Sequence, residues 1–168
     1  MIKKCLEKPD EPNDCTYLGN TSDQNLFAKV VRVELQQWRI WQDEQHVAFL
    51  TPFPNTPGFT VLVPRRPLSS DIFSLGEEDY IALVKACKKV ALLLQKSLNA
   101  HGTSIIFEGL EIDYAHAKLI PLLTSPQAVA TPSKNSEFVA KYPGFVTSVS
   151  GPKAETLSLD DVFQQILA

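Results

Sequence analysis

The sequence contains few cysteines, no long apolar run and little excess charge of either sign. Its three cysteines (Cys5, Cys15 and Cys87) cannot all pair, which excludes a complete disulfide framework. No run approaches the roughly 18 apolar residues that cross a membrane, and the basic start of the chain is not followed by the apolar stretch of a secretory signal. The net charge of −3 argues against a wide nucleic-acid or membrane surface. We therefore expect a cytoplasmic protein with neither nucleic acid nor membrane as partner.

The composition is that of an ordinary globular domain. Of the 168 residues, 44% are hydrophobic and 21% are charged, which is enough for one domain with a substantial core. Polar residues and prolines in residues 1–22 predict a flexible N-terminal arm. Residues 23–123 carry the regular patterns of the expected domain. Residues 124–168 form a C-terminal extension, with a Pro- and Ser-rich linker to about residue 135, a short strand near residues 142–145 and a terminal helix.

The clearest pattern is that of a long amphipathic helix over residues 76–100. Its apolar residues recur at one-turn spacing, and its lysines lie mostly off that stripe. Ser74 and Glu77 have the spacing of a capping box at the start, and Gly102 can end the helix in a left-handed conformation. Cys87 falls on the apolar stripe, so we interpret it as a small core residue.

Two shorter helices are predicted near the ends of the chain. The first covers residues 26–35, with Ser22 or Asp23 as its N-cap. The last begins after Ser158 as N-cap. Its apolar face must dock either on the core of its own chain or on a partner subunit. That face consists of Leu159, Val162, Phe163, Ile166 and Leu167.

Five segments have strand character, and together with the helices they predict an α+β fold. Short connections make antiparallel pairing possible between the first three, and a turn near Gly109 joins the last two. The fold class is therefore an antiparallel sheet of about five strands with one long helix, a short N-terminal helix and the C-terminal extension. The expected strands are residues 38–42, 47–50, 59–63, 104–107 and 114–122.

The last of these strands carries the residues with the most distinctive chemistry. Side chains alternate along a strand, so Tyr114, His116 and Lys118 are expected on one face. An imidazole beside an ammonium makes a plausible anion site, with Glu111 and Asp113 close enough upstream to orient it. A single histidine on a strand is more often a surface or core residue, so the pattern alone does not establish catalysis. Zinc is disfavoured, because lysine is a poor metal ligand.

Several segments, taken in their order along the chain, resemble those of a known protein family. Residues 48–64 resemble the strand–loop–strand core of histidine-triad (HIT) proteins, and the long helix follows at the right distance. Residues 108–121 resemble the strand that carries the triad, and residues 26–34 look like the opening helix of that family. The resemblance covers about residues 25–123, and it implies a HIT-like domain there.

The resemblance also implies a chemistry. The family signature is His-x-His-x-His, whose three positions are Tyr114, His116 and Lys118 here. The middle position is the family's nucleophile, which implies that His116 attacks the α-phosphorus of a nucleotide and that water then releases the nucleoside monophosphate. Lys118 can steady phosphate oxygens but is a poor base near neutrality. Tyr114 can donate one hydrogen bond and carries no charge near pH 7.

The same resemblance sketches a nucleoside pocket. Leu26, Phe27 and Phe49 match positions that sandwich the base, although a plain core role for the two phenylalanines is an equal alternative. Thr51 stands where an acidic residue commonly holds the ribose. The family's metal-binding cysteines correspond to Asn25 and Ala28, so we expect no structural zinc and no other cofactor.

Three functions of different classes follow. The first is a nucleotidyl hydrolase or transferase acting on a dinucleoside polyphosphate or a nucleoside phosphoramidate. The second is a regulatory or sensor protein that binds a nucleotide but has weakened catalysis, because two triad histidines are replaced. The third is an interaction module that keeps only the scaffold. The resemblance further implies an adenosine phosphate-type ligand and a twofold homodimer.

Overall fold

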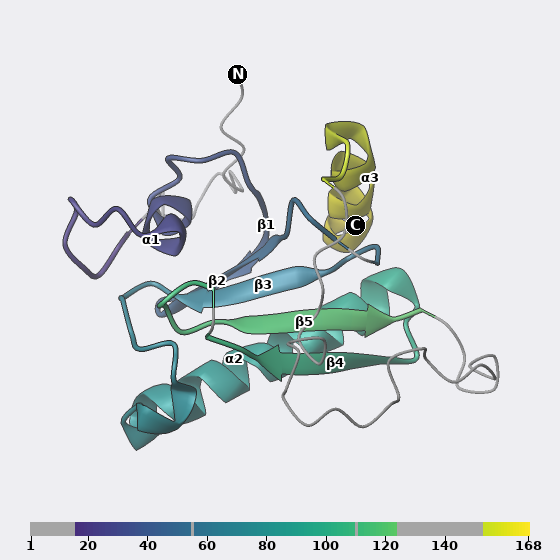
Figure 1. Cartoon of the computed structure of the whole chain (residues 1–168). Helices are drawn as coiled ribbons and strands as arrows, with labels where there is room; N and C mark the ends of the chain where they lie inside the picture. Colours follow the sequence, from purple (N-terminus) through teal and green to yellow (C-terminus); the bar gives the residue numbers. More distant parts are fainter. Residues whose placement is uncertain (1–15, 55, 110, 124–152) are drawn as a thin grey trace, which may run out of the picture.

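The computed structural model describes residues 16–54, 56–109, 111–123 and 153–168 (Figure 1). Five strands form one antiparallel sheet in the order β1-β2-β3-β5-β4. The α+β fold predicted from the sequence is confirmed. Its elements are α1 (Leu26–Val31), β1 (Trp38–Gln42), β2 (His46–Leu50), β3 (Thr60–Pro64), the 3-10 turn η1 (Ile72–Ser74), α2 (Glu77–Leu98), β4 (Gly102–Phe107), β5 (Ala117–Leu122) and α3 (Thr156–Leu167).

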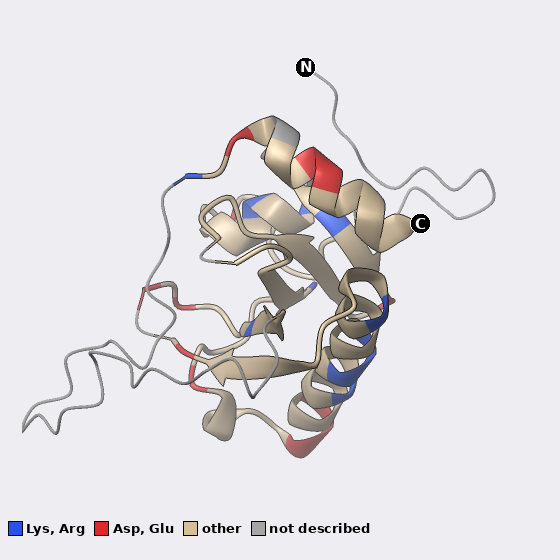
Figure 2. Ribbon diagram, turned by 90° about the vertical axis from the view of Figure 1, so that its right-hand side faces the viewer, with Lys and Arg blue, Asp and Glu red and all other residues tan. Residues whose placement is uncertain are grey.

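The two faces of the sheet carry two separate apolar clusters. The larger cluster joins α2 and α3 to one face of the sheet, through residues such as Leu62, Val90 and Phe163. The smaller cluster joins α1 to the opposite face, through Val47 and Val61 among others. The basic residues of α2 lie on its outer side, away from the sheet (Figure 2). Side chains on one strand alternate between the two clusters, which is the period of two that the sequence pattern predicted.

The long helix α2 forms as predicted, but its two ends differ from the prediction. Cys87 is fully buried, which confirms its core role, and burial raises the pKa of its thiol to about 12. The expected capping box is absent: Gly76 is the N-cap without a side-chain bond, and the Ser74 hydroxyl donates to the carbonyl of Asp71. Asn99, with φ 51°, is the left-handed residue that ends the helix, so Gly102 is free to begin β4.

Helix α1 is shorter than predicted and is capped differently. Its N-cap is Asn25, whose side chain accepts from the backbone N–H of Phe27. Asp23 instead accepts from the backbone N–H of Asn25, so neither predicted cap is used. The helix ends at Val31 because Val33 adopts φ 61°, and the chain then turns toward β1.

The terminal helix α3 docks on the core of its own chain, which answers the alternative left open by the sequence. Leu159, Phe163 and Ile166 are buried. The indole N–H of Trp38 in β1 donates to Asp160 at 2.8 Å. The helix begins at Thr156, after Glu155 as N-cap, so Ser158 lies inside the helix rather than before it.

Parts of the predicted arm and extension can be compared with the structure. Residues 16–22 are tied to the domain: the backbone N–H of Leu18 donates to the carbonyl of Arg65 at 2.9 Å, and Tyr17 packs on the smaller cluster. The rest of the predicted arm, the linker to residue 135 and the strand near residues 142–145 lie outside the described residues. In the part of the chain that is described, no helix has the length and apolar character needed to cross a membrane.

Candidate functional site

A cavity of about 450 Å³ lies on the face of the sheet that carries α1. Its floor contains three side chains that are direct neighbours across three strands, because Phe49 in β2 pairs with Val61 in β3, and Val61 pairs with Lys118 in β5. Helix α1 and the segment that follows it form another wall. The residues lining the cavity are Leu26, Phe27, Val30, Leu35, Gln36, Gln37, Phe49, Leu50, Thr51, Pro52, Phe53, Phe59, Val61, Glu111, Ile112, His116 and Lys118.

His116 lines this cavity from the residue just before β5, so the strand predicted from residue 114 begins later, at Ala117. The side chain is 4% exposed, and its ring centroid lies 5.0 Å from that of Phe27. Its Nδ1 lies 2.7 Å from the carbonyl oxygen of Tyr114. Since a carbonyl only accepts, Nδ1 carries the hydrogen and Nε2 keeps its lone pair.

The surroundings of His116 favour the neutral imidazole. Burial lowers the pKa of His116 below its usual value of 6.5, and the charge of Lys118 acts in the same direction. The hydrogen bond to the carbonyl of Tyr114 opposes this change, as do the carboxylates of Glu108 and Glu111. Because burial is the largest of these effects, the pKa is lowered, and the ring is uncharged and nucleophilic at pH 7.

Tyr114 lies apart from the cavity, although the sequence pattern placed it beside His116 and Lys118. Its side chain is 1% exposed, and its hydroxyl donates to the carbonyl oxygen of Pro64 at 2.9 Å. The ring meets Phe27 edge-on inside the smaller cluster, and burial raises the pKa of the phenol. The chain between Glu111 and Tyr114 is bent, so the alternation of a strand does not extend back to residue 114.

Lys118 meets a partner that the sequence pattern did not suggest. Its Nζ donates to Oε2 of Glu108 at 2.7 Å, and the two side chains are 13% and 8% exposed. Glu108 follows β4, whose residues Ile106 and Phe107 pair with Lys118 and Ala117. Only the register of these two strands brings the carboxylate and the ammonium together. Of the two acids noted upstream, Glu111 lines the cavity, whereas Asp113 accepts a bond from the backbone of Ser70.

The four residues matched to a nucleoside pocket all line the same cavity. Leu26 is 49% exposed, whereas Phe27 and Phe49 are buried with ring centroids 6.1 Å apart. The two phenylalanines are therefore both core residues and cavity walls. Thr51 bends the chain locally, because its hydroxyl oxygen accepts from the backbone N–H of Phe53 at 3.2 Å. The sequence did not suggest residues 35–37 as a wall, because the apolar spacing extended the predicted helix as far as Leu35.

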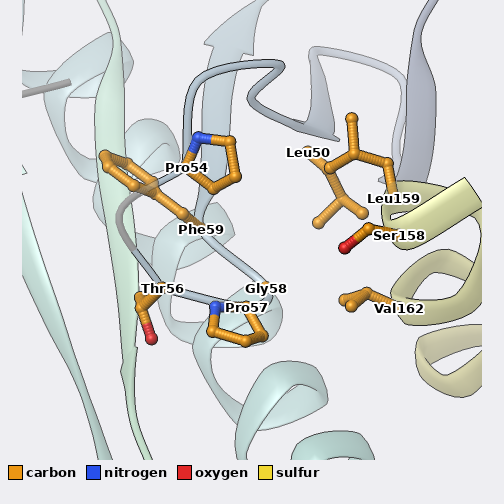
Figure 3. Close-up of a pocket in the computed structure, with 9 residues that line it drawn as sticks. All are labelled: Leu50, Pro54, Thr56, Pro57, Gly58, Phe59, Ser158, Leu159 and Val162. Atoms are coloured by element: carbon orange, nitrogen blue, oxygen red, sulfur yellow. The ribbon is translucent and has the colours of Figure 1, made fainter. Parts of the chain in front are cut away.

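A smaller cavity of about 260 Å³ lies between the β2–β3 loop and α3 (Figure 3). In Figure 3, Val162 of α3 lies across the cavity from Pro57 of the loop, and Leu50 and Leu159 line it as well. The C-terminal segment also touches the loop directly, since the backbone N–H of Ala154 donates to the carbonyl of Pro52 at 3.0 Å. The loop that closes one side of the larger cavity is therefore held from behind by the C-terminal extension.

No cluster of three or more His, Cys, Asp or Glu side chains in the described ranges could hold a metal ion. The cavity is lined by a neutral imidazole, a paired ammonium, the carboxylate of Glu111 and four phenylalanine rings. Such a set suits a ligand with a flat apolar part and an anionic part.

Comparisons with known proteins give a family match and similar folds. A family model described as "HIT domain" matches residues 32–112. An uncharacterized 13.1 kDa HIT-like protein of Mesomycoplasma hyorhinis is 27% identical over 107 residues, which cover 61% of this chain and 96% of that protein. A HIT-like protein involved in cell-cycle regulation from Bartonella henselae has a similar structure, with a TM-score of 0.62, 22% identity and coverage of 88% and 98%. A hypothetical histidine triad nucleotide-binding protein of Sulfolobus tokodaii gives a TM-score of 0.63 at 20% identity, with coverage of 84% and 88%.

Proposed function

We propose that this chain, which belongs to the HIT family, is a nucleotide hydrolase or transferase that cleaves a nucleotide at the α-phosphate through His116. The observation that carries the proposal is the bond between Nδ1 of His116 and the carbonyl oxygen of Tyr114. It leaves the lone pair on Nε2 of a neutral ring at the wall of a cavity large enough for a nucleoside. The proposed substrate is a dinucleoside polyphosphate or a nucleoside phosphoramidate.

The proposed reaction has two steps. In the first, Nε2 of His116 attacks the α-phosphorus, a P–N bond forms, and the bond from phosphorus to the leaving group breaks. In the second, water attacks the same phosphorus, the P–N bond breaks, and the nucleoside monophosphate leaves while the water proton passes to solvent. The ammonium of Lys118 donates hydrogen bonds to the phosphate oxygens in both steps. Splitting one displacement into two lowers each barrier.

The nucleoside occupies the apolar part of the cavity in this proposal. Leu26, Phe27 and Phe49 contact the base, whose flat face suits aromatic walls. Thr51 lies at the same wall and contacts the ribose. Contacts of this kind tolerate different bases, so the proposal specifies an adenosine-type ligand without excluding other purines.

The decisive experiment compares the wild type with His116→Ala and His116→Asn. We expect release of adenosine monophosphate from diadenosine tetraphosphate or adenosine 5′-phosphoramidate to fall by at least about a thousandfold in both variants, as for removal of a nucleophile. Mass spectrometry of acid-quenched wild type should detect one adenylate on the protein, and the variants should carry none. Equal turnover in wild type and variants would overturn the proposal.

A second function is favoured by the placement of Tyr114, which leaves the cavity without the first residue of the usual triad. In this case the protein binds nucleotides as a regulator or sensor and turns them over very slowly. Calorimetry with adenosine monophosphate separates the possibilities. Binding without turnover favours the sensor, and no binding at millimolar ligand leaves only a scaffold.

We also propose a twofold homodimer that uses the open edge of the sheet. Among the strands in the described part of the chain, β4 forms one edge of the sheet, and an edge strand can pair with a strand of another chain. Ile105 on β4 is 42% exposed and Leu92 on α2 is 56% exposed. Light scattering at tens of micromolar protein should give twice the mass of the chain, and Ile105→Lys should give the monomer. A monomeric wild type would contradict this assembly.

A further inference from the structure

The ion pair of Glu108 and Lys118 lies at the wall of the cavity that holds His116. Lys118 pairs with Ile106 across the two strands, so Glu108, two residues further along, extends over the same face toward His116. Lys118 lines the cavity, whereas Glu108 does not. The carboxylate therefore holds the ammonium from behind, at a distance of 2.7 Å.

We propose that Glu108 is the positioning residue of the site, which fixes the Lys118 ammonium beside His116 for contact with the phosphate. This inference rests on the function proposed above and adds to it a residue outside the usual triad positions. In this inference, the phosphate contact at the third triad position depends on the pair of Glu108 and Lys118 and not on Lys118 alone.

The chemistry of lysine explains why such a partner is needed. A lysine side chain has four flexible methylene groups and ends in a compact charge, so an unpartnered one samples many positions. One hydrogen bond to Glu108 fixes the ammonium and leaves two N–H groups for phosphate oxygens. Both side chains are largely shielded from water, and a buried charge without its partner is strongly unfavourable. The pair therefore places a positive charge in the wall before the substrate arrives.

The pair also acts on His116, and its two members act in opposite directions. The imidazole faces Lys118 from β5, Glu108 and Glu111 from the β4–β5 connection, and the apolar ring of Phe27 from α1. Lys118 lowers the pKa of His116 and Glu108 raises it. Removing either member should therefore move the acid limb of the pH–rate profile, and the two variants should move it in opposite directions.

The test uses Glu108→Gln, Lys118→Met and the double variant in the full chain. We expect Glu108→Gln to lower kcat by up to about a hundredfold, which is the effect of misplacing a group by about 1 Å. Its acid limb should shift to lower pH, whereas that of Lys118→Met should shift to higher pH. In the Lys118→Met background, Glu108→Gln should reduce kcat little further, because its target is already absent.

A matched control is Asp79→Asn, which breaks the ion pair with Arg66 outside the cavity. It should leave both kcat and the pH profile unchanged. Glu108→Asp keeps the charge on a shorter side chain, so it should restore the wild-type position of the acid limb with part of the kcat. If Glu108→Gln does not fold, Glu108→Asp replaces it as the test of the positioning role. A change in thermal stability alone, with kcat and the acid limb unchanged, would overturn the positioning role.

The proposed hydrolysis and the role of Glu108 can be refuted separately. If the wild type binds adenosine monophosphate but releases no product, the proposed hydrolysis is refuted. The role of Glu108 is then tested by the affinity for adenosine monophosphate, measured by calorimetry. Glu108→Gln should weaken binding of adenosine monophosphate about tenfold, while Asp79→Asn should not change it. Equal affinity in Glu108→Gln and wild type would overturn the inference, and so would the absence of binding to the wild type.

Discussion

Val33 connects the short helix α1 to the cavity wall through an unusual backbone conformation. Its φ of 61° lies in the left-handed region, which costs a residue with a Cβ about 1–2 kcal/mol. Two hydrogen bonds of 3.0 Å hold it there, from the backbone N–H of Val33 to Val30 and from that of Glu34 to Lys29. The chain leaves this turn toward residues 35–37, which line the cavity. Glycine is the residue that ordinarily occupies such a position.

Two substitutions separate the strain from the packing. Val33 is 6% exposed, so Val33→Ala should lose about 1.6 kcal/mol for two buried methyl groups while keeping the strain. Val33→Gly also loses the buried Cβ, which costs about a further 0.8 kcal/mol, but it relieves about 1–2 kcal/mol of strain. We therefore expect Val33→Gly to be more stable than Val33→Ala by up to about 1 kcal/mol. In the interior of a helix the order is reversed by a similar amount.

Urea unfolding followed by circular dichroism measures both variants, compared at equal m-values. The control is the pair Lys88→Ala and Lys88→Gly at an exposed position of α2, where alanine should be the more stable by up to about 1 kcal/mol. If glycine were less stable than alanine at position 33 by the same amount as at position 88, the reasoning from backbone strain would be refuted.

Two further predictions concern His116 and Tyr114. Because burial lowers the pKa of His116, wild-type kcat/KM should be flat near pH 7 and fall with a midpoint below 6.5, and a midpoint above 6.5 would contradict this. The contribution of His116 to the free energy of unfolding follows the same pH dependence. It is fully present above pH 6.5 and is lost as the pH falls toward the lowered pKa, because the imidazole of the unfolded chain binds its proton at a higher pH. This contribution should be absent in His116→Asn. Tyr114→Phe should lower the free energy of unfolding by about 1–2 kcal/mol, since the carbonyl of Pro64 loses its buried donor. Its kcat should stay within about threefold of wild type in the same assay, and a loss as large as that of His116→Ala would return Tyr114 to the catalytic group.

Most of the regular structure could be predicted because it depends on local periodicity. The strands and α2 have apolar side chains at periods of two and near 3.6, and their observed bounds differ from the predicted ones by a few residues. The end of α1 could not be predicted in the same way. Leu35 continues the helical spacing, but it lines the cavity after the turn at Val33. A valine in a left-handed conformation gives no signal in the sequence, whereas a glycine would have given one.

In the candidate site too, features that depend on neighbouring residues could be predicted, and features that depend on distant residues could not. Alternation correctly brought His116 and Lys118 to one cavity, although only Lys118 lies within β5. It failed for Tyr114, because the bend before that residue turns its side chain into the core. The contact of Glu108 with Lys118 could not be predicted, since it depends on the register of two strands. Distances across a sheet follow from pairing, which a single sequence specifies only weakly.

In the proposed mechanism, the position of Tyr114 explains how His116 can act as the nucleophile although the first triad histidine is absent. His116 is oriented by the backbone carbonyl of Tyr114, and any residue at position 114 supplies that carbonyl. The side chain at position 114 is therefore free to serve the core, provided that it keeps the backbone in place. At position 118 the proposed phosphate contact does depend on the side chain, and in our proposal Glu108 holds the lysine there. Under this proposal the two replacements have unequal consequences: the one at position 114 changes packing, and the one at position 118 makes the site depend on Glu108.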